Sequence, residues 1–137
     1  MRYLGLDLGT KTLGLALSDR TGMIANPYKT LKFNDTSELI VPLKKLIEEE
    51  SIAEIALGLP KNMDGSMGFA SERSLKFKEL LESEIDIPIT LVDERLSTVE
   101  AEMYLLNADM SRKKRKEVID AVAASVILNT FIRMKGK

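Results

Sequence analysis

Two short apolar segments of this 137-residue chain each follow a stretch with helical periodicity, and this alternation limits the folds open to the chain. The apolar segments cover residues 53–59 and 89–92, and the helical stretches before them cover residues 35–50 and 69–84. A strand that follows a crossover helix normally lies parallel to its neighbour in the sheet. We therefore expect both segments to be parallel strands of one sheet, with helices on its faces.

Three further segments, all near the amino terminus, are typical of extended strands. Residues 3–8 and 12–18 are apolar and rich in β-forming residues, and Gly9-Thr10-Lys11 between them predicts a tight hairpin. A third strand is expected over residues 24–31, after a polar turn. The order of elements predicts an α/β chain with a central five-stranded mixed sheet and helices on both faces, which is the ribonuclease H-like architecture. The length predicts one such domain over residues 1–137.

Two more helices are expected in the carboxyl-terminal third of the chain. Ser97 and Glu100 form a capping-box pattern, which predicts a helix that runs through Leu106. Residues 115–134 carry apolar side chains at helical spacing and predict a long last helix with a broad apolar face.

The composition narrows the chemistry, because the chain contains neither Cys nor His. Disulfides, thiolate zinc sites and acid–base mechanisms that use histidine are excluded. Carboxylates, amines and hydroxyls remain, and such hard oxygen ligands favour Mg²⁺ or Mn²⁺. No apolar run approaches the roughly 18 residues of a membrane span, and no secretory signal follows Met1, so we expect a cytoplasmic protein.

Acidic residues stand at three informative places along the chain. They are Asp7 near the end of the first strand, the pair Asp93 and Glu94 at the end of a later strand, and Asp120 inside the apolar last helix. An ionised carboxylate in apolar surroundings is costly unless it is paired or coordinated, and ligand sites gather where the strands of an α/β sheet end. Together these residues fit a site for two divalent ions, about 3.5–4 Å apart, that hydrolyses phosphodiesters.

Each acidic residue also has a purely structural explanation. Asp7 precedes a glycine-containing turn and could cap it. Asp93 and Glu94 could stabilise the positive end of a helix dipole. Asp120 could pair with Lys116 one helical turn earlier, an exposed contact worth a few tenths of a kcal/mol.

Basic residues supply candidate phosphate contacts. Lys11, Lys61 and Arg95 are expected on loops at the same edge of the sheet as the acidic residues. An unbroken basic run, Arg112-Lys113-Lys114-Arg115-Lys116, is expected just before the last helix. Because the net charge is −1, binding of nucleic acid has to rest on such local patches, and ordinary solvation of loops and helix starts is the alternative.

Four short sequence motifs, spread over almost the whole chain, together resemble those of a known protein family. They are Gly5-Leu6-Asp7-Leu8-Gly9-Thr10-Lys11 with Gly14-Leu15-Ala16-Leu17-Ser18-Asp19, Gly58-Leu59-Pro60 with Gly65, Asp93-Glu94-Arg95-Leu96-Ser97-Thr98, and Asp120-Ala121-Val122-Ala123-Ala124. In this order and spacing they resemble the YqgF/RuvX family of Holliday-junction resolvases, which are also assigned as nucleases that mature the 5′ end of precursor 16S rRNA. The resemblance implies a ribonuclease H-like fold, a Mg²⁺ or Mn²⁺ cofactor and acidic site residues at Asp7, Asp93-Glu94 and Asp120.

Some positions depart from the patterns expected of related enzymes. Unlike the RuvC resolvases, the chain has no glutamate at the end of the strand that closes with Gly58-Leu59-Pro60, and Ala123 stands where a second helix aspartate is expected. Glu94 is the expected substitute, which makes Asp7, Glu94 and Asp120 the predicted catalytic residues. Thr12 stands where the resembled family usually has Arg, so one phosphate contact is in question.

Three functions stay open from the sequence. The first is a metal-dependent endonuclease for structured nucleic acid, which processes the 5′ end of pre-16S rRNA, resolves Holliday junctions, or both. The second is a non-catalytic RNA-binding assembly factor, and the third is an actin-like ATP-binding module suggested by Asp7-Leu8-Gly9-Thr10. The expected partner is structured RNA or branched DNA and not a membrane, and the expected state is a monomer or weak homodimer.

Overall fold

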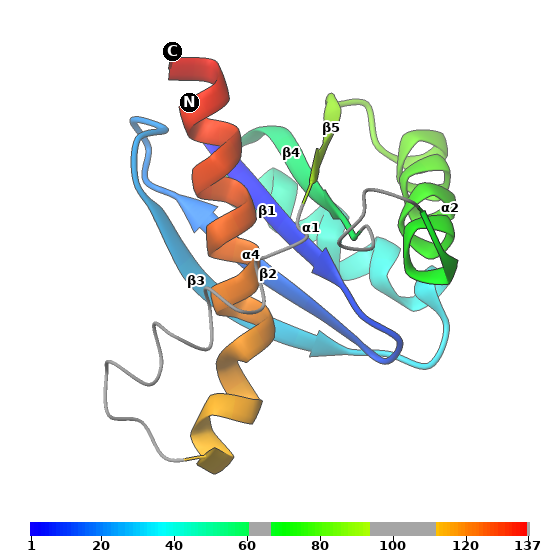
Figure 1. Cartoon of the computed structure of the whole chain (residues 1–137). Helices are drawn as coiled ribbons and strands as arrows, with labels where there is room; N and C mark the ends of the chain where they lie inside the picture. The colour runs from blue at the N-terminus through cyan, green and yellow to red at the C-terminus, as the bar shows by residue number, and fades with distance from the viewer. Residues whose placement is uncertain (61–66, 94–111, 137) are drawn as a thin grey trace.

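Five strands form one mixed sheet in the computed structural model, which describes residues 1–60, 67–93 and 112–136, with the side chains of the last segment from residue 119 onward. Across the sheet their order is β3-β2-β1-β4-β5 (Figure 1). The strands are β1 (Arg2–Leu8), β2 (Thr12–Ser18), β3 (Ala25–Lys32), β4 (Ile52–Leu59) and β5 (Ile89–Asp93). β2 runs antiparallel to β1 and β3, whereas β4 runs parallel to β1 and β5. The predicted mixed sheet is therefore confirmed, and the carboxyl ends of β1, β4 and β5 share one edge.

Helices cover both faces of this sheet, as predicted. The described helical segments are η1 (Thr36–Leu39), α1 (Ile40–Glu49), α2 (Phe69–Glu84) and α4 (Arg112–Gly136). The predicted capping box forms between Asp35 and Glu38, but it starts a short 3-10 turn that precedes α1. None of the described helices is long and apolar enough to cross a membrane.

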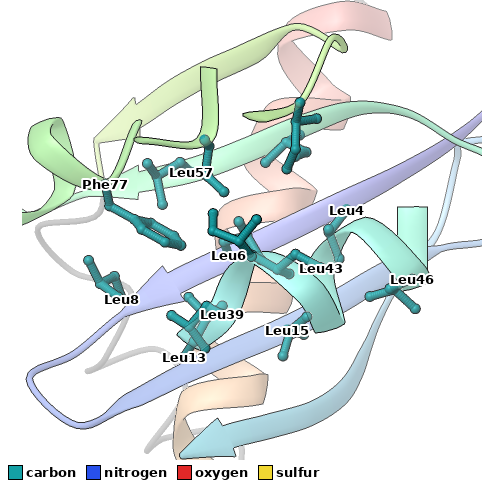
Figure 2. Close-up of a cluster of buried hydrophobic side chains, with 14 of the residues drawn as sticks. Leu4, Leu6, Leu8, Leu13, Leu15, Leu39, Leu43, Leu46, Leu57 and Phe77 are labelled. Carbon is teal, nitrogen blue, oxygen red and sulfur yellow. The ribbon is translucent and has the colours of Figure 1, made fainter. Parts of the chain in front are cut away.

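The face covered by α1 and α2 holds the larger apolar core (Figure 2). Alternate residues of β1, namely Leu4, Leu6 and Leu8, point to this face and are almost fully buried. They pack with Leu43 of α1 and Phe77 of α2. By the two-residue period of a strand, the residues between them point to the opposite face of the sheet.

The opposite face is covered by α4, which packs on β1, β2 and β3 (Figure 1). Small residues line this contact: Ala16 of β2, Ala56 of β4 and Ala124 of α4 are fully buried. A side chain on Gly5 of β1 would lie 2.7 Å from Leu128 Cβ. The helix backbone therefore approaches the sheet closely.

Of the two helices predicted in the carboxyl-terminal third, the structure describes the last one. The last helix begins at Arg112 rather than near residue 115, so the basic run forms its first turns instead of preceding it. Arg and Lys are good helix formers, which explains why the helix includes them. The helix predicted from Ser97 through Leu106 lies outside the described residues.

Candidate functional site

Asp7 lies one residue before the end of β1, on the face of the sheet that α4 covers. Its neighbours Leu6 and Leu8 are buried on the other face, so strand alternation turns the Asp7 side chain towards α4. Asp7 is half-buried and lies directly opposite Gly14 of β2. Cα atoms of such antiparallel pairs are about 4.5–5.5 Å apart.

Gly14 is also where α4 comes closest to β2. A methyl group in place of its hydrogen would overlap the backbone carbonyl of Asp120 and would lie 3.0 Å from the amide nitrogen of Ala121. Gly14 thus touches Asp120 on one side and pairs with Asp7 on the other. The structure brings together two acidic residues that the sequence predicted for one site.

A hydroxyl group holds the Asp120 carboxylate. Thr12 Oγ1 donates a hydrogen bond to Asp120 Oδ2 at 2.7 Å, and both groups are partly buried. Lys116, one helical turn before Asp120, is the alternative partner that its sequence position suggests, but the Lys116 side chain lies outside the described residues. Thr12 was missed as a site residue, although its position two residues before Gly14 puts it on the same face of the sheet as Asp7 and Asp120.

Asp93 ends β5 on a different face. It pairs with Leu59, and its neighbour Val92 belongs to the apolar cluster under α4. Alternation therefore assigns Asp93, which is exposed, to the face of α1 and α2, away from Asp7. Glu94, the other member of the predicted pair, lies outside the described residues.

The end of β4 supplies no carboxylate, as the sequence indicated. Leu6 pairs with Leu57, so Gly58 is the next residue of β4 beside Asp7. Gly58 has no side chain to offer, and the following Leu59 is buried. Any further acidic ligand beside Asp7 has to come from an element other than β4.

Of the predicted phosphate-binding residues, only Lys11 has a described side chain. Lys11 is exposed at the tip of the β1–β2 hairpin, next to Thr12. Lys61 and Arg95 lie outside the described residues. The backbone of the basic run Arg112–Lys116 is helical, and the side chains of that run are not described.

The donor atoms at this site suit a hard divalent cation. Two half-buried carboxylates, Asp7 and Asp120, offer oxygen ligands, which is the chemistry that Mg²⁺ and Mn²⁺ prefer. Among the side chains that the structure describes, in residues 1–60, 67–93 and 119–136, no group of three or more acidic residues gathers as a metal site. The two carboxylates fit a metal as part of a ligand set that needs at least one more member.

Comparison with known proteins identifies the family of this chain. Residues 1–134 match the family described as RuvX, Holliday junction resolvase. The chain belongs to the RuvX family. A RuvX relative from Geobacillus sp. (strain WCH70), named "Putative pre-16S rRNA nuclease", is 48% identical over 137 residues, which cover 98% of this chain and 99% of the relative. A protein of the same name from Bacillus subtilis (strain 168) is 48% identical over 134 residues, with 96% of this chain and 97% of the relative covered.

Solved structures extend the RuvX likeness to the fold of resolvases with distant sequences. The T. thermophilus RuvC complex with a Holliday junction substrate superposes with a TM-score of 0.59 at 13% identity, over 99% of this chain and 96% of RuvC. The Fowlpox virus resolvase in complex with Holliday junction DNA gives a TM-score of 0.60 at 10% identity, with 100% of both chains covered. These likenesses confirm the predicted ribonuclease H-like fold of this RuvX-family protein.

Proposed function

We propose that this protein is a metal-dependent endonuclease for structured nucleic acid, with the 5′ end of pre-16S rRNA as its main substrate. The observation that carries the proposal is the convergence of Asp7 and Asp120 at Gly14, from opposite ends of the sequence. Membership of a resolvase family and relatives named for pre-16S rRNA support the reaction and the substrate. The proposed location is the cytoplasm.

In this proposal Asp7, Glu94 and Asp120 hold two Mg²⁺ or Mn²⁺ ions. Strand alternation turns Asp93 to the face of α1 and α2, away from Asp7, and for that reason Glu94 and not Asp93 is proposed as the third ligand. When bound there, such ions would supply an activated water for hydrolysis of the phosphodiester and would stabilise the leaving oxygen. The protein's own part is to hold ionised carboxylates at fixed positions in partly buried surroundings.

Basic residues in the proposal orient the nucleic acid on this site. Lys11 extends from the hairpin tip beside Thr12 and is exposed to solvent, as a phosphate contact needs to be. Lys61 and Arg95 are proposed as further contacts, with Arg95 suited to a bidentate grip on one phosphate. The run Arg112–Lys116 is in the same helix as Asp120, one to two turns before it. In the proposal it binds phosphates of the nucleic acid that lie away from the cleaved bond.

A second substrate, the DNA four-way junction, is favoured by one specific observation. The chain matches a family described as Holliday junction resolvases along residues 1–134. Both substrates are branched or folded nucleic acids with closely spaced phosphates, and the proposed carboxylate site does not distinguish a ribose from a deoxyribose. A direct comparison of the two substrates decides between them.

The test is a cleavage assay with purified protein and Mn²⁺ or Mg²⁺. A pre-16S rRNA 5′ fragment and a synthetic four-way DNA junction serve as substrates. We expect Asp7→Asn and Asp120→Asn each to lower the cleavage rate by more than about a hundredfold. Loss of a residue that only hydrogen-bonds a metal ligand already lowers metal affinity or activity by about 10- to 100-fold, and loss of a ligand should cost more. Asp86→Asn is the matched control, since Asp86 is exposed and precedes β5 at the opposite edge of the sheet.

The outcomes separate the candidate functions. Metal-dependent cutting that is lost in both site variants and kept in Asp86→Asn supports the nuclease. Salt-sensitive binding without cutting, unaffected by Asp7→Asn, would favour the RNA-binding assembly factor instead. Cleavage at the wild-type rate in either site variant would overturn the assignment of the site.

A further inference from the structure

The hydrogen bond between Thr12 and Asp120 joins residues 108 positions apart in the sequence. The distance from Thr12 Oγ1 to Asp120 Oδ2 is 2.7 Å, which is typical of a hydroxyl that donates to an ionised carboxylate. The bond links the start of β2 to α4, at the helix residue that the proposed function uses as a metal ligand. Its geometry therefore bears directly on how that ligand is oriented.

The donor is held firmly by the hairpin. The backbone N–H of Gly9 donates to the Thr12 carbonyl at 2.8 Å, and the N–H of Phe33 donates to the Lys11 carbonyl at 3.0 Å. Thr12 also pairs with Lys32 in the β2–β3 ladder. A side chain at Gly9 would come within 3.2 Å of Thr12 Oγ1, so this glycine keeps open the space that the hydroxyl occupies.

The acceptor is held equally firmly by the packing of α4. Two residues after Thr12, Gly14 lies against the Asp120 backbone. The next residues of the helix, Ala121 and Val122, are buried. With both backbones fixed, the hydroxyl restricts the rotation of the Asp120 side chain and sets the direction of its carboxylate.

The chemistry of the donor matters as much as its position. A hydroxyl is neutral, so its hydrogen bond adds no positive charge next to the carboxylate, and an ionised carboxylate has about four acceptor positions of which this bond uses one. An arginine in place of Thr12 would instead bring a permanent positive charge to the carboxylate. The Thr12 hydroxyl bonds one oxygen of Asp120 and leaves the remaining acceptor positions of the side chain open to a cation.

We propose that Thr12 is a positioning residue for metal binding, which acts by holding Asp120 in the orientation that a divalent ion needs. The inference rests on the proposed function, because it requires Asp120 to be a metal ligand. A β-strand does not by itself need a hydroxyl at position 12. The proposed role needs the hydroxyl group, so serine should be able to replace threonine there.

The experiment measures Mn²⁺ binding to the metal-free protein by calorimetry, without nucleic acid. We expect Thr12→Val, which keeps the shape and removes the donor, to weaken Mn²⁺ binding by about 10- to 100-fold. Thr12→Ser restores the donor and should bind within about threefold of wild type. Thr30→Val is the matched control: Thr30 pairs with Gly14 from β3, and its buried hydroxyl has no hydrogen-bond partner in the described residues.

Thermal melting without metal separates positioning from a general structural role. A loss of stability in Thr12→Val with unchanged Mn²⁺ affinity would overturn the inference, because a purely structural residue predicts that result. If Thr12→Val does not fold, Thr12→Ala is used in its place, and wild-type Mn²⁺ affinity in that variant likewise contradicts the inference. Equal weakening in Thr12→Val and Thr12→Ser would also contradict it.

Asp120→Asn distinguishes failure of this inference from failure of the proposed function. If Asp120→Asn loses Mn²⁺ binding while Thr12→Val binds like wild type, the metal site stands and the role of Thr12 is wrong. If Asp120→Asn binds Mn²⁺ like wild type, the proposed metal site itself is wrong, and the inference about Thr12 falls with it.

Discussion

Gly14 is the residue on which the geometry of the site depends most. It is buried between Asp7 on the neighbouring strand and the Asp120 backbone on α4, and the space around it has no room for a methyl group. Strand propensity alone would favour a larger residue here. The close approach of helix and sheet explains why glycine occupies this position.

We predict that Gly14→Ala lowers the free energy of unfolding by about 1–3 kcal/mol, the usual cost of overpacking, because α4 has to move away from β2. The same movement should separate Asp120 from Thr12 and weaken Mn²⁺ binding. Urea denaturation and calorimetry measure the two effects. Gly136→Ala is the control, since no atom lies within 4 Å of the added methyl group; equal stability of the two variants would contradict the predicted clash.

At the scale of elements, the turn between β2 and β3 is organised by one carboxylate. Asp19 accepts hydrogen bonds from the Thr21 hydroxyl and from the backbone N–H groups of Met23 and Ile24. These bonds, with that of Thr21 the strongest influence, lower the pKa of Asp19 from 3.8 to about 2. The ionised form therefore stabilises the folded state relative to the unfolded chain.

We predict that Asp19→Ala lowers the melting temperature at neutral pH. Because the folded pKa is depressed, the contribution of Asp19 is fully present above about pH 4 and is lost as the pH falls through about 2. The difference in melting temperature between wild type and variant should shrink across that interval. Asp86→Ala is the control at an exposed position, and a difference that stayed constant from pH 6 to pH 2 would exclude the predicted role of the Asp19 charge.

Most elements could be predicted from the sequence because their boundaries carry local signals. The hairpin turn at Gly9 and the capping box at Asp35 mark their boundaries chemically, and the structure has both. The start of α4 could not be predicted as well, because a basic run is compatible with either a loop or a helix. The short 3-10 turn before α1 was missed for a similar reason, since its sequence pattern is the same as that of an ordinary helix start.

Residues of the site were harder to predict than the elements, because the site depends on contacts across the sheet. Asp7 and Asp120 could be identified as costly carboxylates in apolar surroundings. The partner of Asp120 could not, since Thr12 lies 108 residues away and threonine in a strand is unremarkable by itself. The assignment of Asp93 to the far face follows from the packing of its neighbour Val92 under α4, which is seen only in the structure.

At the scale of the whole molecule, positive and negative charges almost cancel. A protein of this kind can bind nucleic acid only where basic residues are concentrated on part of its surface. The net charge is −1, and the unbroken basic run Arg112–Lys116 lies at the start of α4. Binding of nucleic acid by such a run releases counterions, so affinity falls as salt rises.

We predict that Lys113→Glu with Lys114→Glu weakens binding to the pre-16S rRNA fragment and flattens the dependence of log Kd on log salt concentration by about one unit for each lost phosphate contact. Fluorescence anisotropy at several salt concentrations measures both quantities. Lys44→Glu with Lys45→Glu is the control with the same change in net charge, because both lysines are exposed on α1, across the sheet from α4. A salt dependence that changes equally in this control would mean that net charge, and not the basic run, governs binding.

The contact between the β1–β2 hairpin and α4 has a consequence for how the protein is made. The hairpin leaves the ribosome early, but its partner residue in the site is encoded 108 positions later than Thr12. Synthesis proceeds from the amino terminus and a domain generally folds as a unit, so a nascent chain carries Asp7 for most of its elongation without Asp120. On the proposed function, a growing chain would have no cutting activity towards nearby RNA until α4 had been translated and had docked on the sheet.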